Sequence, residues 1–200
     1  MDRVGLPAIE CLRHPVAMTD DSGRSGEGPR QQQPSAPSAA RVVYNYFDGA
    51  ANPLLAKITD EMMAAVDKAD AAGFTRDDIL NPQGWELLSF IMDARTGLGR
   101  FRDFGISNYE LMMKLIDSCR QHATITDILA LPDVKERVEL YCEQEKLFRE
   151  QVKQCATVHK NLVVLDLRNE EVIYAGNRFM IYAMYPECNI SIHVLWGLKQ

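Results

Sequence analysis

The densest group of residues able to handle phosphate lies at positions 93–102, directly after an apolar run. Asp93 ends that run, Arg95 and Arg100 follow it, and glycines occupy positions 97 and 99. Glycine lets a backbone approach an anion closely, and arginine offers paired donors to phosphate. The order of residues is not that of a P-loop. The segment predicts phosphate contacts from Arg95 and Arg100; the alternative is a helix-end loop in which arginine and aspartate pair with each other.

A second candidate anion site is Asn177-Arg178, within the phrase "YAGNRFMIY". The two residues follow a glycine and open a short predicted helix. The N-terminus of a helix presents unpaired N–H groups that favour anions. Asn177 and Arg178 are therefore predicted phosphate contacts, and simple helix capping is the alternative.

Asp67 and Asp70 lie three residues apart, so they share one face of a predicted helix. They fall in its last turn, where the helix macrodipole disfavours anions. A divalent cation between the two carboxylates would explain the placement, because Mg²⁺ and Mn²⁺ prefer carboxylate oxygen. The alternative is an ordinary solvated helix end.

The first half of the chain is predicted to be helical. Ser38 is the expected N-cap of a helix in "SAARVVYNYF", and a second helix is expected over 52–73, from an Asn-Pro start to a glycine stop. Thr75 and Asn81 give two further start signals. The segment "PQGWELLSFIMDA" is predicted to be helical, with a buried strand as the alternative for "LLSFIM".

The second half of the chain changes from helices to strands. Ser107 and Glu110 form a capping box before a helix, a short helix is expected over 127–131, and a long one over 133–158. The long helix is interpreted as an amphipathic helix on a domain face or between two domains, with a coiled coil as the alternative. Residues 161–200 predict two strands around an Arg-Asn-Glu turn, a short helix, and a strand in "NISIHVLWGL".

Composition limits the class of protein. The chain has 200 residues, 46% of them hydrophobic, and a net charge of −6, which argues against a mainly electrostatic nucleic-acid binder. Its five cysteines are widely spaced, so neither a disulfide framework nor a zinc site is expected. No apolar run reaches the roughly 18 residues that span a bilayer, and a cytoplasmic location without membrane contact is expected. Residues 19–37 are rich in Gly, Ser, Pro and Gln, and 1–37 is expected to be a disordered or low-complexity segment.

From about Ser38 to Gln200 the chain resembles the DHH phosphoesterase superfamily, in particular its exopolyphosphatase-like members. The phrases that carry the resemblance are "PSAARVVYNYF", "MAAVDKADAAGF", "GWELLSFIMDARTGLGRFRDFGISNYELM", "NLVVLDLR" and "YAGNRFMIYAMYPECNISIHVLWGLKQ". The resemblance implies a two-domain α/β hydrolase that uses two metal ions, typically Mn²⁺ or else Mg²⁺. It implies as substrate polyphosphate, a short oligonucleotide or a related nucleotide.

The resemblance also implies a division of the chain. Residues 38–131 would be the helical C-terminal half of a DHH-type domain, 132–160 a linking helix, and 161–200 the start of a smaller α/β substrate-binding domain. The family's fourth motif, a metal-binding aspartate followed four residues later by an aromatic residue, matches Asp70 in "DAAGF", with Asp67 and Asp93 as alternates for the metal ligand.

Other family motifs have no counterpart in this sequence, namely the early D-x-D, the Asp-His-His triplet and the C-terminal Gly-Gly-Gly-His. We therefore expect a fragment that is inactive in isolation, marginally stable and prone to associate through exposed sheet edges. A non-catalytic phosphate-binding or protein-interaction remnant is the alternative function, and a homodimer is left open.

Overall fold

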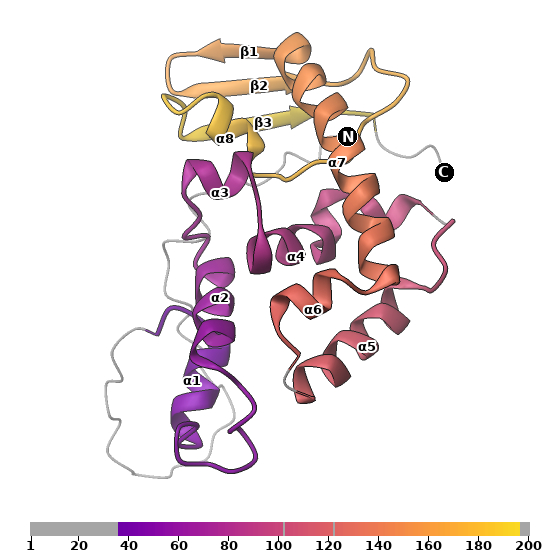
Figure 1. Ribbon diagram of the computed structural model, residues 1–200. Coiled ribbons are helices and arrows are strands. Elements are labelled where there is room, and N and C mark those ends of the chain that lie inside the picture. The colour runs from indigo at the N-terminus through magenta and orange to yellow at the C-terminus, as the bar shows by residue number, and fades with distance from the viewer. Residues whose placement is uncertain (1–35, 102, 122, 197–200) are drawn as a thin grey trace, which may run out of the picture.

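A computed structural model describes residues 36–101, 103–121 and 123–196 (Figure 1). The expectation for residues 1–37 therefore falls almost entirely outside the described residues. The elements are α1 Ala39–Tyr46, α2 Asp60–Asp70, α3 Arg76–Leu80, α4 Gly84–Met92, the 3₁₀ turns η2 Ala94–Thr96 and η3 Leu98–Arg100, α5 Asn108–Arg120, α6 Ile125–Leu129, α7 Pro132–Cys155, β1 Ala156–His159, β2 Leu162–Asp166, α8 Met180–Met184 and β3 Ile190–Val194. This mixture of helices and a small sheet agrees with the predicted α/β class.

Three helix starts follow the capping signals of the sequence, but the start signal at Asn81 is wrong, because Asn81 is the C-cap of α3 and α4 begins after Gln83. Ser38 caps α1, and Thr75 and Ser107 each form a complete capping box, before α3 and α5 respectively. The expected helix over 52–73 is wrong at its start, since α2 begins at Asp60 with Thr59 as the N-cap. The reason is local: the side chain of Asn52 accepts a hydrogen bond from the Leu54 N–H, which closes a turn and does not begin a helix.

The segment "LLSFIM" lies in α4, so helix is the correct choice between the two alternatives. Helix α7 ends three residues earlier than expected, because the chain turns into strand β1 at Ala156. Along α7, Val134 and Tyr141 are buried in one apolar cluster and Phe148 and Val152 in another. The helix thus joins two cores of its own chain (Figure 1).

The sheet has the order β1-β2-β3, with β1 and β2 antiparallel and β2 and β3 parallel. In β2, Val163 and Leu165 point into the core and are fully buried. The second strand predicted after the Arg-Asn-Glu turn is wrong, because no strand forms between 167 and 179. There the N–H groups of Tyr174 and Ala175 donate to side chains of α7, at Gln151 and Gln144.

Two apolar clusters make up the core. One lies between the sheet, α8 and the C-terminal half of α7; the other lies among α4, α5, α6 and the first half of α7. Phe74 and Phe179 pack against both clusters. The ring of Phe74 lies 4.8 Å from that of Phe90 and 5.4 Å from that of Phe179, measured between centroids. These rings hold the helical part and the sheet part together.

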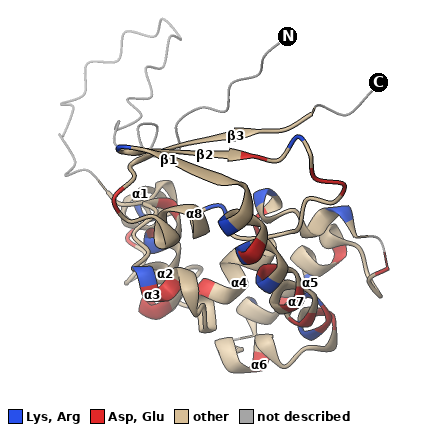
Figure 2. Cartoon of the chain, turned by 90° about the horizontal axis from the view of Figure 1, so that it is seen from above, with Lys and Arg blue, Asp and Glu red and all other residues tan. Residues whose placement is uncertain are grey.

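Two helix faces remain open to solvent in the described part of the chain. Helix α5 carries an exposed apolar stripe at helical spacing, and α1 ends in a second one; their members are Tyr109, Met112, Met113 and Ile116, and Val42, Val43 and Tyr46. Charged side chains of both signs are interspersed along α7 (Figure 2). Across the described residues, none of the helices has the length and apolar character needed to cross a membrane.

Candidate functional site

Four of the seven predicted site residues come together where α4 ends. Asp93 is the C-cap of α4, and its carboxylate accepts hydrogen bonds from the backbone N–H and the Nε of Arg95, at 2.9 and 2.8 Å. Its Oδ2 lies 3.6 Å from Nε of Arg178, which comes from the loop before α8. Asn177 precedes that arginine. Residues distant in sequence therefore form one cluster of two arginines, one carboxylate and one amide, which we call the Asp93–Arg178 cluster.

Backbone contacts fix the loop of residues 175–179 against the end of α4. The N–H of Gly176 donates to the carbonyl of Thr96 at 3.0 Å, and the buried hydroxyl of Thr96 donates to the carbonyl of Phe90 at 2.6 Å. A Cβ at position 176 would lie 2.0 Å from Cδ1 of Phe148, so only glycine fits there. The position of the 175–179 loop therefore depends on Gly176 and Thr96, and no pattern in the sequence marks either residue for this role.

The electrostatics of the cluster follow from its burial. Burial raises the pKa of the Asp93 carboxyl, but the hydrogen bonds from Arg95 outweigh burial, so this pKa lies below its ordinary value. Burial, followed by the neighbouring charge of Arg95, lowers the pKa of Arg178. Its guanidinium also stacks on the ring of Phe179, 4.1 Å from the centroid. Two arginines held close together beside a single carboxylate leave a net positive charge there.

Two donors of the cluster have no acceptor within the described residues. Nδ2 of Asn177 and Nε of Arg178 are both buried without a hydrogen-bond partner, although Oδ1 of Asn177 accepts from the N–H of Phe179. A buried donor left unpaired costs about 1–3 kcal/mol, so such groups normally have a partner. An anion that offers oxygen atoms would satisfy both donors, with the 63% exposed side chain of Arg95 beside them.

The other predicted phosphate contact, Arg100, makes its hydrogen bond within its own turn. It is exposed in η3, and its Nε donates to the carbonyl of Gly97 at 3.1 Å. The side chain thus closes its own 3₁₀ turn. Arg100 as a phosphate contact stays a prediction.

The predicted metal ligands on α2 are placed differently from each other. Asp67 accepts from Oγ of Ser38 at 2.6 Å and from Nε and Nη2 of Arg41 at 2.9 and 2.6 Å, which ties α1 to α2. Asp70 is exposed at the last position of α2. Asp93 is engaged by the two arginines described above.

These donor sets do not fit a two-metal centre. In the described ranges, no group of three or more His, Cys, Asp or Glu side chains is placed to hold a metal ion. The carboxylates of Asp67 and Asp93 already accept from cationic side chains. We therefore draw no catalytic step through a metal from these residues, and their roles as ligands stay predictions.

Comparisons with known proteins show what the chain as a whole is similar to. No protein-family model matches the chain, and a search of curated proteins finds no match. Among solved structures, the chain is similar to the pGpG-specific phosphodiesterase PggH from Vibrio cholerae, with 57% sequence identity and a TM-score of 0.73. The alignment covers 84% of this chain and 57% of that one, so the chain spans a little over half of the length of PggH.

Proposed function

We propose that this chain is the phosphate-binding part of a phosphodiesterase-like hydrolase of the DHH type whose substrate is a short nucleotide such as pGpG. The 57% identity to PggH supports a phosphodiesterase and a dinucleotide substrate over an exopolyphosphatase and polyphosphate. The same similarity supports the resemblance to DHH phosphoesterases.

The observation that carries the proposal is that two buried donors, Nδ2 of Asn177 and Nε of Arg178, have no hydrogen-bond acceptor within the described residues; Asp93, 3.6 Å from that Nε, is too far away to accept from it. A phosphate group would offer oxygen acceptors to both donors, and the exposed guanidinium of Arg95 would offer further donors beside them. Asp93 keeps the two arginines from repelling each other when no phosphate is bound. It also orients them, so the phosphate would meet a site whose donors are already in place.

The chemistry of cleavage would need groups other than these. By the resemblance, activation of water and stabilisation of charge on the phosphoryl group would be supplied by bound Mn²⁺ or Mg²⁺. The described residues supply binding and orientation of the phosphate. A non-catalytic phosphate-binding module is the second candidate function, because Asp67 and Asp93 are both engaged by arginine.

Calorimetric titration with pGpG tests the phosphate site. We expect Arg178→Ala to weaken binding by roughly tenfold or more, since a hydrogen bond to a charged group contributes about 1.5–3 kcal/mol. Arg178→Lys should recover only part of the affinity, because the lysine ammonium lacks the planar, forked set of N–H donors that the guanidinium offers to phosphate. Arg120→Ala is the matched control, since Arg120 is exposed on α5, with 72% of its side chain accessible.

Two outcomes would count against the proposal. Equal affinities for Arg178→Ala and Arg120→Ala would remove the cluster from the binding site. Displacement of pGpG by inorganic polyphosphate at comparable concentration would favour the exopolyphosphatase-like substrate instead. Release of GMP from pGpG with added MnCl₂ would decide between the hydrolase and the binding module.

A further inference from the structure

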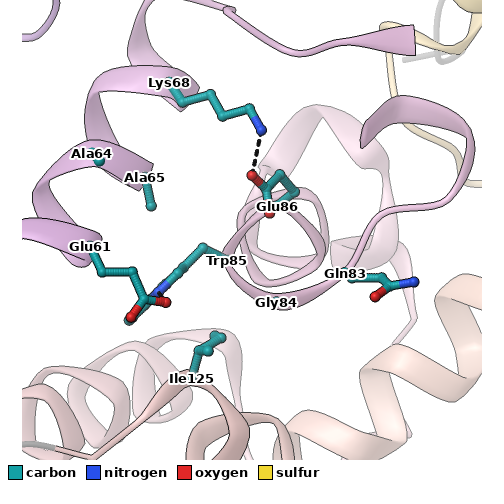
Figure 3. A pocket seen from close by; sticks show the side chains of 9 residues that line it. All are labelled: Glu61, Ala64, Ala65, Lys68, Gln83, Gly84, Trp85, Glu86 and Ile125. Atoms are coloured by element: carbon teal, nitrogen blue, oxygen red, sulfur yellow. Dashed lines mark hydrogen bonds and ion pairs between the residues drawn. The ribbon is translucent and has the colours of Figure 1, made fainter. Parts of the chain in front are cut away.

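A surface cavity of about 470 Å³ lies between α2 and the start of α4 (Figure 3). The Asp93–Arg178 cluster lies at the other end of α4. Its walls come from three helices. The lining residues are Glu61, Ala64, Ala65 and Lys68 of α2, Gln83 to Glu86 at the start of α4, and Ile125 of α6. The phosphate site does not use any of them.

Trp85 is fixed within this cavity by a specific contact. Its Nε1 donates to Oε1 of Glu61 at 2.8 Å, so the half-buried indole extends from α4 across to α2 (Figure 3). The facing side chains, Ala64 and Ala65, are small, and they leave the space beside the ring open. A held aromatic ring with open space beside it is a platform on which a flat group can stack.

The charges of the cavity exclude a phosphate. Lys68 is its one cationic lining residue in the described structure, and its Nζ lies 2.6 Å from Glu86 and 2.9 Å from Asp78. The hydrogen bond to Glu86, more than any other contact, raises the pKa of Lys68, so the lysine is charged and already paired. With Glu61 and Glu86 in the lining, the cavity offers no net attraction to an anion. A neutral group suits it better.

The hydrogen-bonding groups select among neutral flat ligands. The second oxygen of Glu61 accepts no bond within the described residues, and Gln83 makes no side-chain cap at the start of α4, which leaves the first N–H groups of that helix available as donors. A guanine base presents N–H donors beside a carbonyl acceptor, and so complements a carboxylate next to N–H groups. Adenine places a ring-nitrogen acceptor where guanine has its N–H, and the carboxylate would oppose it.

We infer that this cavity is a subsite for a guanine base, which stacks on Trp85 and donates to Glu61. The inference rests on the proposed function, because the base would belong to the nucleotide whose phosphate lies at Asn177 and Arg178. Helix α4 joins the two places. Its nine residues rise roughly 13 Å, a span that an extended dinucleotide covers.

The two tryptophans of the chain make a direct test possible. Trp196→Phe leaves Trp85 as the one tryptophan, so its fluorescence reports on the cavity. We expect guanosine, which carries no phosphate, to quench this fluorescence saturably and to bind roughly tenfold more tightly than adenosine. Non-saturating quenching, or equal effects of the two nucleosides, would overturn the inference.

Two variants in the Trp196→Phe background sharpen the test. Glu61→Gln keeps an oxygen for Nε1 of Trp85 but loses the charge, and it should reduce the preference for guanosine. Ala65→Leu fills the space beside the ring and should abolish quenching by guanosine with little change in the melting temperature. A cavity variant that melts like its parent and still binds guanosine at full affinity would contradict the subsite.

The same titrations separate this inference from the proposed function. Arg178→Ala should leave the quenching of Trp85 by guanosine unchanged, while it lowers the affinity for pGpG. If Arg178→Ala weakens pGpG but guanosine does not bind, the phosphate site stands and the base subsite fails. If guanosine binds and Arg178→Ala does not change the affinity for pGpG, the base subsite stands and the proposed phosphate site fails.

Discussion

The carboxylate of Asp93 and the guanidinium of Arg178 face each other at 3.6 Å, between residues 85 positions apart in the sequence. The pair joins the end of helix α4 to the loop that precedes α8. Because Arg95 donates to the same carboxylate, one aspartate serves two arginines. The binding properties and the stability of this junction should therefore both depend on the charge of Asp93.

Asp93→Asn tests this dependence through stability. We expect the free energy of unfolding at pH 7 to fall by about 1–2 kcal/mol, because the two arginines lose their shared counter-ion. The folded pKa of Asp93 lies below its ordinary value of 3.8, so the contribution of its charge is present above that pH and is lost as the pH falls through the folded pKa.

Urea denaturation between pH 7 and pH 3 is the measurement. The difference between the wild-type chain and Asp93→Asn should shrink at the acid end of that range. A variant with the same midpoint as the wild type at pH 7, or a constant difference down to pH 3, would show that the carboxylate does not stabilise the junction.

Phe74 should influence the position of Arg178 through the ring of Phe179. Its ring packs on Phe179, on which Arg178 stacks. We expect Phe74→Leu to cost about 1 kcal/mol in unfolding free energy and also to weaken pGpG binding, since the support beneath the guanidinium moves. Phe101→Leu is the control, because Phe101 packs on the helical cluster. If both variants lower stability and neither changes the affinity for pGpG, the aromatic contacts have a structural role alone.

Substitution of Arg137 is expected to lower stability strongly and to leave pGpG binding unchanged. Its side chain is 1% exposed, stacks on Phe104 at 4.1 Å, and donates to the carbonyl of Ile106 at 2.7 Å and to Oδ1 of Asn108 at 3.1 Å. Arg137→Met should cost about 3–5 kcal/mol, because these acceptors and Glu136 lose a buried partner. Chemical denaturation measures the loss. Wild-type stability in this variant would mean that water replaces the guanidinium at little cost.

The sequence predicts local features well and long-range ones poorly. Ser38, Thr75 and Ser107 mark helix starts because a cap needs only its own side chain and the next few N–H groups. Asn52 misleads since the same amide can close a turn. Strand β1 was not predicted, because the sequence pattern of Ala156–His159 continues that of the amphipathic helix before it. The segment becomes a strand by pairing with β2.

The candidate site shows the same division. Residue types alone pointed to Asp93, Arg95, Asn177 and Arg178, and the structure brings these four together. Their meeting depends on the contact between Gly176 and Thr96, which no local pattern encodes. The cavity beside Trp85 likewise arises from three helices that pack at one place, and each of its residues looks ordinary within its own segment.

Asp67 offers a test that separates a structural carboxylate from a metal ligand. It accepts from Ser38 and Arg41, with 13% of its side chain exposed. We expect Asp67→Asn to lower the unfolding free energy by about 1–2 kcal/mol and to speed amide hydrogen exchange in α1, because α1 loses its tie to α2. Calorimetric titration with MnCl₂ should give the same result for the variant and the wild type, since the carboxylate is already engaged. Loss of a tight Mn²⁺ site in Asp67→Asn, with α1 still protected, would instead identify Asp67 as a metal ligand.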